Sequence, residues 1–582
     1  MAGKTVIQYV LGRLKDLGVT DTFGCPGDFV YPVCDAICDD PDIQGVWCAN
    51  ELNASYAAEG YARTKGVGVV VSTYGPGELS TFCGLGGAHG ENVKVVSLTG
   101  MPGLSEWQGN RTHHMIADQP PNYDLFVKMV SPLTAGGDGA AVITPENCVY
   151  ETERLIAAMI YHSRPINLAF PRDVPNQPVV MPQGELNIPL ANPQSDPDAL
   201  EAVVREILYR VTNAKQACIL PGYLLRRYDC VAEARAMIEA SGLPFVSSLQ
   251  DKGVLPESHP QFAGVYLGRW GGLADPAVTE FVEACDCIIG LGPENHEFNN
   301  AFHTMKYDFK ETMNITPHHT RVGMATYDKV AMKDVLSALA QQIPNRKDVT
   351  GPSYGGSPTK LGAPSGEAND AIAYTPMFER FQTFLKPNDI LVADTSVTAI
   401  CGNMRFQLPD GVELEAGASW GSIGWGTPEI LGNCVAAPDR RCIIVAGEGG
   451  HQMTANEMGT FYRYGAKPIF LTVNNGGYFA ERVTNRHPDE AYNDLAKWNF
   501  ADIPAAMGCE DWYTAKVSTL GELDAALAEA GKVDTGVYIE IIVDPWLCPQ
   551  GAEFLFTLTG ALVGEPTRTW NGWLKEMAAK KK

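Results

Sequence analysis

The sequence predicts an α/β protein made of three doubly wound, parallel-sheet domains, and three observations support this. The chain has 582 residues, which at roughly 150 residues per domain corresponds to about three or four domains. Apolar residues make up 45% and charged residues 19% of the chain, as in proteins with large buried cores. Short runs rich in Val and Ile alternate with helical patterns, which is typical of buried parallel strands covered by helices.

The charge balance and the cysteines restrict the class of protein. Lys and Arg total 44 against 68 Asp and Glu, a formal charge of -24, and such a surface repels a phosphate backbone, so no nucleic-acid partner is expected. The 15 cysteines are scattered without zinc-site spacing and indicate reduced thiols. No apolar stretch approaches the roughly 18 to 20 residues of a membrane span, and no signal peptide is recognisable. We therefore expect a cytoplasmic protein that does not bind membranes.

The first units of the chain alternate helix and strand. Thr5 can cap a helix with an apolar face, and a strand is expected at 19–23. A second strand is expected at 44–47, followed by a helix that Glu51 opens and a β-rich run at 67–73. This alternation predicts a parallel sheet with helices on both faces.

A layout of strand, glycine turn, helix and strand occurs twice, at residues 69–98 and at residues 442–473. The repetition predicts that the first and last domains are related. Because every doubly wound sheet contains such units, coincidence is an equal alternative on this observation alone.

Two stretches predict domain boundaries. Residues 171–197 are crowded with prolines, and residues 344–369 are rich in Gly, Ser and Pro without apolar periodicity. No glycine fingerprint follows the strand-like segments of the middle domain, so no dinucleotide site is expected there. The predicted divisions are domains at 1–187, 188–345 and 370–582 and a linker at 346–369.

The turn Gly447-Glu448-Gly449 lies between a buried strand and a helix, and Asn474-Asn475 end the next strand. Carboxylate and amide oxygens at adjacent strand ends are the ligands that Mg²⁺ prefers. Bare glycine backbone lets a diphosphate approach a helix N-terminus. Taken alone, however, the turn is more simply a surface glutamate between a strand and a helix.

The spacing of these elements resembles the G-D-G to N-N signature of thiamine diphosphate enzymes, and further motifs of that family follow in order across nearly the whole chain. They are Gly27-Asp28, Asn50-Glu51-Leu52-Asn53 with Glu59-Gly60-Tyr61-Ala62-Arg63, His113-His114 and Trp420-Gly421-Ser422-Ile423-Gly424. The chain most resembles pyruvate decarboxylase and related 2-oxo acid decarboxylases. The resemblance implies pyrimidine-binding, central and diphosphate-binding domains, with thiamine diphosphate and Mg²⁺ as cofactors.

The resemblance implies cofactor-binding roles for individual residues. Glu51 would bond pyrimidine N1' and promote the imino tautomer, whose 4'-nitrogen is the base; alone it is a helix N-terminal glutamate favoured by the dipole. Ile423 would be the aliphatic wedge between the cofactor rings, with the Gly421 carbonyl bonding the 4'-amine; alone it is a core residue. Mg²⁺ would be held by Glu448, Asn475 and Gly477, and further cofactor contacts are expected from Thr73, Thr395, Gly449, Gly450 and Tyr478.

The pair His113-His114 indicates how the reaction ends. In the decarboxylases that it resembles, such a pair works with an early aspartate and a late glutamate, which match Asp28 and Glu481. Asp28, His114 and Glu481 would move the proton that precedes aldehyde release, and His113 would orient substrate or cofactor. Acetolactate synthase-like carboligases typically lack the pair. Such a carboligase stays the alternative activity, and a non-catalytic assembly protein is a third.

Two features depart from the family pattern. Glu448 stands where the family usually has the shorter aspartate, and we predict that it still coordinates Mg²⁺. Small side chains at Ala399 and Ala480, with Phe298 at a position that is often aromatic, predict a larger substrate pocket. Each methylene that an apolar pocket accommodates is worth roughly 1 to 3 kcal/mol. We therefore expect the 2-oxo acid to be pyruvate or a larger analogue, with branched-chain 2-oxo acids, phenylpyruvate and indolepyruvate as the alternatives.

The remaining expectations concern the assembly of chains and the packing of the C-terminal segment. In the family, the first and last domains meet across a dimer interface, which implies a homodimer or a homotetramer built as a dimer of dimers. The apolar segment 553–563 is expected to pack on the core, with closure over the site as the alternative.

Overall fold

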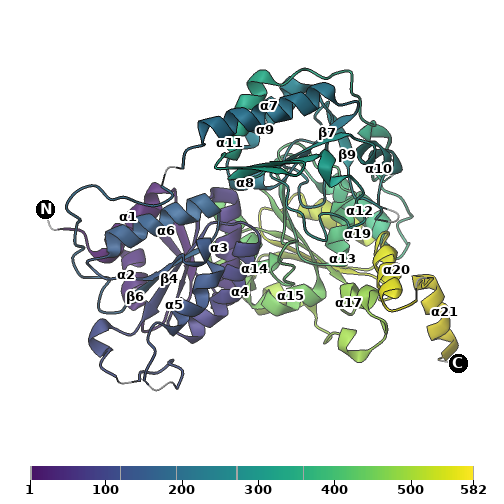
Figure 1. Ribbon diagram of the computed structural model, residues 1–582. Coiled ribbons are helices and arrows are strands. Elements are labelled where there is room, and N and C mark those ends of the chain that lie inside the picture. The colour runs from purple at the N-terminus through teal and green to yellow at the C-terminus, as the bar shows by residue number, and fades with distance from the viewer. Residues whose placement is uncertain are drawn as a thin grey trace.

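The computed structural model describes residues 3–580 except for 110, 118, 119, 192, 271, 272, 358 and 566. Figure 1 shows three α/β units: an N-terminal unit in purple and blue, a central unit in teal, and a C-terminal unit in green and yellow. The strands of the three sheets fall within residues 21–171, 217–328 and 390–542. The predicted fold class is confirmed, while the exact domain boundaries stay predictions.

The N-terminal unit follows the predicted alternation of helix and strand. Its strands are β1 (Asp21–Gly24), β2 (Gln44–Trp47), β3 (Gly68–Ser72), β4 (Val95–Met101), β5 (Ala140–Val142) and β6 (Ile166–Pro171). Its helices are α1 (Val6–Asp16), α2 (Tyr31–Asp39), α3 (Glu51–Lys65), α4 (Pro76–Gly90), α5 (Leu125–Val130) and α6 (Cys148–His162). Thr5 caps α1 through a capping box with Gln8, as its position predicts.

Strand β3 shows that this sheet is covered on both faces. Val70 belongs to a buried cluster with Ala57 of α3, whereas Val69 and Val71 belong to another cluster with Val10 of α1. Successive strand residues point to opposite faces, so a strand buried on both faces reads as a continuous apolar run.

The central unit has a seven-stranded sheet in its described part, in the order β13-β12-β11-β10-β7-β8-β9. It is parallel from β7 to β11, but β12 and β13 run antiparallel, a departure from the predicted purely parallel sheet. Only Gly323 and Met324 separate these two strands, and Gly323 takes the left-handed conformation (φ 56°) that a tight hairpin needs. The strands are β7 (Ala217–Pro221), β8 (Phe245–Ser247), β9 (Phe262–Val265), β10 (Cys287–Leu291), β11 (Thr312–Ile315), β12 (His319–Val322) and β13 (Ala325–Asp328). The helices are α7 (Pro197–Asn213), α8 (Leu224–Arg227), α9 (Val231–Ser241), α10 (Pro276–Glu283) and α11 (Met332–Gln342).

The C-terminal sheet repeats the topology of the N-terminal one. The two orders are β15-β14-β16-β17-β19-β18 and β2-β1-β3-β4-β6-β5, which are identical when each sheet is numbered from its first strand. The predicted relation of the two domains is therefore confirmed at the level of topology. The strands are β14 (Ile390–Ala393), β15 (Glu413–Ala416), β16 (Cys442–Gly447), β17 (Ile469–Asn474), β18 (Tyr513–Val517) and β19 (Val537–Ile542).

The helices of the C-terminal unit include two that follow the last strand. They are α12 (Tyr374–Phe384), α13 (Val397–Asn403), α14 (Gly426–Ala436), α15 (Glu448–Thr454), α16 (Met458–Arg463), α17 (Phe479–Thr484), α18 (Ile503–Ala506), α19 (Leu520–Ala530), α20 (Ala552–Leu562) and α21 (Trp570–Lys580). Phe556 of α20 and Phe479 of α17 both pack against Trp570 of α21. This is the core packing expected of the 553–563 segment. Among the described helices, none is long and apolar enough to cross a membrane.

Helices α3 and α14 occupy equivalent places in the two related units and pack against each other. A Cβ at Gly60 would collide with the Glu429 carbonyl, and a Cβ at Gly432 would collide with the Ala57 carbonyl. Both glycines therefore allow the backbones to approach closely. The N- and C-terminal units share one buried cluster across this contact, so they form a continuous core.

Candidate functional site

A cavity of about 340 Å³ opens at the carboxyl ends of β14, β16 and β17. The carboxyl edge of a parallel sheet is where turns bring side chains from separate strands together. Ten of the residues predicted for the site line this cavity: Thr395, Ile423, Glu448, Gly449, Gly450, Asn475, Gly477, Tyr478, Ala480 and Glu481.

Glu448 reaches across the cavity from the start of α15 to the turn that follows β17. Its Oε1 accepts hydrogen bonds from the backbone N–H of Asn475 at 3.1 Å and of Gly477 at 2.9 Å. Burial raises the pKa of Glu448 to about 7, because the charged form loses its hydration. The longer side chain thus reaches the strand end at which a cation is predicted.

Asn475 supplies a second oxygen beside Glu448. Its Nδ2 lies 3.5 Å from the hydroxyl of Tyr374, but its buried Oδ1 has no hydrogen-bond partner among the described residues. A buried amide oxygen without a partner costs free energy unless a ligand satisfies it. Carboxylate and amide oxygens are hard donors, so this pair fits Mg²⁺.

Two glycines keep one wall of the cavity free of side chains. A Cβ at Gly449 would lie 2.6 Å from the ring of Tyr478, and a Cβ at Gly450 would collide with the carboxylate of Asp394. The bare backbone at the start of α15 is the surface that a diphosphate can approach. The wall and the oxygen donors together fit a metal-bound diphosphate.

Glu51 lies in the other unit, at the first position of α3. The side chain of Asn50 caps this helix by accepting the Asn53 N–H at 2.9 Å. The Glu51 carboxylate faces the start of α4, since a Cβ at Gly77 would lie 3.3 Å from its Oε1. A carboxylate at a helix start is favoured by the helix dipole and stays available for a ligand.

The turns after β1 and β3 meet beside Glu51. A Cβ at Gly27 would collide with Thr73, and a Cβ at Gly75 would lie 2.8 Å from the carbonyl of His114. The buried Thr73 hydroxyl has no hydrogen-bond partner in the described chain. The N-terminal members of the predicted site therefore share one patch at the carboxyl edge of their sheet.

Asp28, His113 and His114 form a cluster in this patch. The Nε2 of His113 lies 3.1 Å from Oδ2 of Asp28, and the two imidazole rings are 4.5 Å apart between centroids. The Nδ1 of His114 lies 3.1 Å from the carbonyl of Tyr74. The cluster predicted from the dipeptide is thus assembled in the fold.

The loop that carries Ile423 is held by the N-terminal unit of the same chain. Ile423 lines the cavity, and Gly421 takes a positive φ of 69° in open space. The hydroxyls of Tyr56 and Ser422 are 2.8 Å apart. The indole of Trp420 lies over the glycines of α4.

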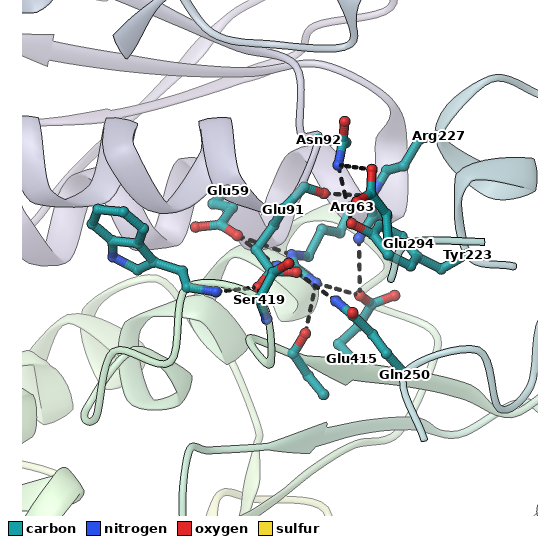
Figure 2. A network of polar contacts seen from close by, with 12 residues as sticks. Glu59, Arg63, Glu91, Asn92, Tyr223, Arg227, Gln250, Glu294, Glu415 and Ser419 are labelled. Atoms are coloured by element: carbon teal, nitrogen blue, oxygen red, sulfur yellow. Dashed lines mark hydrogen bonds and ion pairs between the residues drawn. The ribbon is translucent and has the colours of Figure 1, made fainter. Parts of the chain in front are cut away.

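Figure 2 shows a buried network that fixes the beginning of this loop. The Oε1 of Glu91 accepts the N–H groups of Ser419 at 2.7 Å and Trp420 at 2.9 Å. Its Oε2 accepts the side-chain amide of Gln250 from the central unit at 2.7 Å. Glu91 therefore joins all three units at the base of the loop.

Arg63 forms the other half of the network (Figure 2). Its guanidinium pairs with Glu59 at 2.7 Å and with Glu415 at 3.0 Å, and all three side chains are buried. A buried ion pair is costly to break, because one charge is then left without a partner. The network thus ties the junction of the units together.

The predicted site has two halves, which lie apart in a single chain: the cavity around Glu448, and the patch that contains Glu51 and Asp28. Among the described residues, those that line the cavity all belong to the C-terminal unit. Helix α15 begins at Glu448, and Glu457 lies just beyond its other end. The backbone N–H of Ala49, two residues before Glu51, donates to the Glu457 carboxylate. No hydrogen bond or ion pair of the described residues joins Glu51 or the Asp28 cluster to the cavity.

The predicted pocket residues divide in the same way. Ala480 lines the cavity, whereas Ala399 is buried within α13 and donates its N–H to Ser396 Oγ at 3.0 Å. Phe298 packs against Phe302 in the central unit, with ring centroids 5.2 Å apart. Only one of the three predicted residues therefore lines the cavity of a single chain.

Sequence reasoning missed several residues that support the site. Asp394 is fully buried and accepts the N–H groups of Gly424 and Gly426 at 3.3 and 3.1 Å, and burial raises its pKa to about 6. Asp394 could have been identified from the sequence, because a carboxylate directly after a buried strand is a recognisable pattern. Tyr374, whose hydroxyl lies 3.5 Å from Asn475 Nδ2, has no such pattern around it.

Comparisons with known proteins agree with this geometry. Residues 4–121, 204–342 and 399–541 match the N-terminal TPP binding domain, the central domain and the C-terminal TPP binding domain of thiamine pyrophosphate enzymes. An alpha-keto-acid decarboxylase of Mycobacterium leprae is 31% identical over 541 residues, 93% of either chain. Proteins of the same name from Mycobacterium avium and Mycobacterium tuberculosis are 32% and 30% identical, over 93% and 96% of this chain and 94% and 97% of their own.

Proposed function

Because this chain belongs to the family of thiamine diphosphate-dependent 2-oxo acid decarboxylases, we propose that it uses Mg²⁺ and thiamine diphosphate to convert a 2-oxo acid to an aldehyde and CO₂. The observation that carries the proposal is the buried Asn475 Oδ1, which lacks a partner in the described chain and lies beside Glu448 in a glycine-walled cavity. This donor set has the chemistry of a metal-bound diphosphate site.

The C-terminal unit holds the charged end of the cofactor. Glu448 and Asn475 would supply side-chain oxygens to Mg²⁺, and the Gly477 carbonyl would be a further ligand. Gly449 and Gly450 present bare backbone to the cavity, which the diphosphate would approach. Asp394 keeps the loop that carries Ile423 in place through its two backbone hydrogen bonds.

The N-terminal unit performs the proton chemistry. When bound, thiamine diphosphate supplies the carbon nucleophile for the 2-oxo group and takes up the electrons released as CO₂ departs. Glu51 would bond pyrimidine N1' of the bound cofactor through a shared proton. His114 Nε2, Asp28 and the Glu481 carboxylate move the proton that the product requires, and His113 orients the substrate.

Each complete site takes its two halves from different chains. The position of α15 supports this arrangement. Glu448 begins this helix and lines the cavity, whereas the segment before Glu51 is bound to Glu457, beyond the other end of the helix. A homodimer then has two sites, and a homotetramer four. Sedimentation of the holoenzyme tests the assembly, and a fully active monomer contradicts it.

The preferred substrate is a 2-oxo acid larger than pyruvate. Ala480 presents a single methyl group to the cavity directly before Glu481. In an apolar pocket each additional methylene of the substrate is worth roughly 1 to 3 kcal/mol. We expect kcat/KM for 2-oxoisocaproate and phenylpyruvate to exceed that for pyruvate, and a strong preference for pyruvate contradicts this.

The deciding experiment measures CO₂ release from a panel of 2-oxo acids, with and without thiamine diphosphate and Mg²⁺. We expect release only with both, aldehyde as the product, and a melting temperature that both raise. Glu201→Gln, an exposed change on α7, serves as the control variant. An acetohydroxy acid as the product, or no effect of the cofactors on melting, overturns the proposal.

A further inference from the structure

We propose that Asp28, His113 and His114 form a second cation site, which takes a transition metal ion such as Zn²⁺ and inhibits the enzyme when it is filled. The site differs from the predicted Mg²⁺ site in both its donors and its unit of the fold. Binding of the metal is independent of the proposed function, whereas inhibition rests on it.

The ligand atoms are close enough to share one ion. One donor atom from each of the three residues lies within 4.8 Å of the other two. In a tetrahedral Zn²⁺ site with bonds of about 2.0 to 2.1 Å, neighbouring ligands are roughly 3.3 to 3.5 Å apart. The 3.1 Å between His113 Nε2 and Asp28 Oδ2 is already near that value, so small side-chain rotations complete the site.

His114 is held as metal-binding histidines usually are. Its Nδ1 lies 3.1 Å from the carbonyl of Tyr74, which can only accept a hydrogen bond. In the neutral ring the proton is then on Nδ1, and Nε2 has the lone pair that a metal binds. A carbonyl or carboxylate on the second ring nitrogen fixes the tautomer and orients the ring of a metal ligand.

His113 is restrained by packing while its metal-binding edge stays open. Its ring packs on Phe29 and on the ring of His114, with centroids 4.8 and 4.5 Å away. Its side chain is nevertheless 58% exposed and that of Asp28 39% exposed. A metal can therefore enter, and water can complete its coordination.

The donor set selects the metal. Two imidazoles and one carboxylate suit Zn²⁺, Co²⁺ and Cu²⁺, whereas Mg²⁺ prefers oxygen ligands and keeps several waters. Arg172 is the competing cation, with Nη1 3.9 Å from Asp28 Oδ2. His113 and Arg172 both contact Oδ2, so Arg172 competes with the metal for this oxygen.

A bound metal removes the groups that the reaction uses. It occupies the lone pair of His114 Nε2 and a carboxylate oxygen of Asp28, so neither can accept or return the proton. The expected result is slower turnover at constant Mg²⁺.

Cobalt provides a direct test, because tetrahedral Co²⁺ absorbs visible light much more strongly than octahedral Co²⁺. The holoenzyme, with saturating thiamine diphosphate and excess Mg²⁺, is titrated with Co²⁺, and Zn²⁺ is then added as a competitor. We expect one intense band per chain that Zn²⁺ removes and Mg²⁺ does not. A weak octahedral spectrum, or displacement by Mg²⁺, overturns the proposal, because the metal then occupies an oxygen site.

Variants identify the ligands independently of catalysis. His113→Asn and His114→Asn are each expected to weaken Co²⁺ and Zn²⁺ binding at least about tenfold. His319→Asn, which removes an exposed imidazole from β12 in the central unit, is the matched control and should bind as the wild type does. Unchanged affinity in both cluster variants overturns the site. Tight binding without loss of CO₂ release overturns only the inhibition.

Discussion

The N- and C-terminal units have the same strand order but place an equivalent carboxylate in different surroundings. In each unit a glutamate stands in the first turn of the helix after the third strand: Glu78 follows β3 and Glu448 follows β16. Both side chains are buried, and burial raises the pKa of Glu78 to about 8 and that of Glu448 to about 7.

The two carboxylates differ in the backbone that they bind. Glu78 Oε2 accepts the N–H of Gly75 at 3.0 Å and so closes its own turn. Glu448 Oε1 instead accepts two N–H groups from the turn after the neighbouring strand and lines a cavity. The same topology thus provides a structural carboxylate in one unit and a candidate metal ligand in the other. The role of each glutamate depends on which turn its side chain points to, and the fold alone does not determine it.

Removing the acid of Glu51 is expected to have the largest effect. Glu51→Gln keeps the size of the side chain but cannot hold the proton at pyrimidine N1', so turnover should fall by about 10² to 10⁴. Because the diphosphate end is held by the other unit, thiamine diphosphate and Mg²⁺ should still raise the melting temperature. Steady-state kinetics and thermal unfolding measure both. Turnover within threefold of the wild type contradicts this role.

Changing Glu448 tests the C-terminal carboxylate. Glu448→Gln replaces an anionic ligand by a neutral amide, and we expect affinity for Mg²⁺ in the presence of thiamine diphosphate to fall about 10- to 100-fold. Titration calorimetry measures the affinity. Glu448→Asp is the control, because it keeps the charge and should retain more affinity than Glu448→Gln. Equal affinities in both variants would mean that Glu448 does not touch the cation.

Local patterns predicted much of the fold and many of the residues that line the cavity. Continuous apolar runs located β3 and β16, because strands buried on both faces leave that pattern in the sequence. The turn residues Glu448 and Asn475 were found because neighbouring parallel strands bring their carboxyl ends together.

The missed contacts join residues that are far apart in the chain. Tyr374 meets Asn475 across 101 residues, and Glu91 meets Trp420 across 329. A single tyrosine or glutamate in a helical pattern carries no information about a partner that only tertiary packing brings near. The division of the site between the two units, by contrast, was foreseen, because the motifs of Glu51 and Glu448 fall in different predicted domains.

The pH dependence of the free energy of unfolding tests the role of Glu78, the buried carboxylate of the N-terminal unit. The pKa of Glu78 in the folded chain is about 8, above its ordinary value of 4.5. Its contribution to stability is therefore fully present below pH 4.5 and is lost as the pH rises through 8, by at most about 1.4 kcal/mol per pH unit. Glu78→Gln stays neutral and can still accept the Gly75 N–H, so it should lose less stability over this range. Urea unfolding at several pH values measures this, and an unchanged slope contradicts it.

The smallest expected effect concerns Tyr56. This residue of the N-terminal unit contacts Ser422, in the loop of the C-terminal unit that carries Ile423. Tyr56→Phe removes the 2.8 Å contact with Ser422 and should weaken thiamine diphosphate binding by about 0.5 to 1.5 kcal/mol, or roughly two- to tenfold. Ser422→Ala should have a similar effect, and the double variant should lose little more than either single variant, because both remove the same contact. Tyr61→Phe is the matched control, since this buried hydroxyl on the same helix bonds Asp21 within the N-terminal unit. It should lower stability without changing cofactor affinity. Additive effects of the Tyr56 and Ser422 changes would mean that the contact between the two hydroxyls does not contribute to cofactor binding.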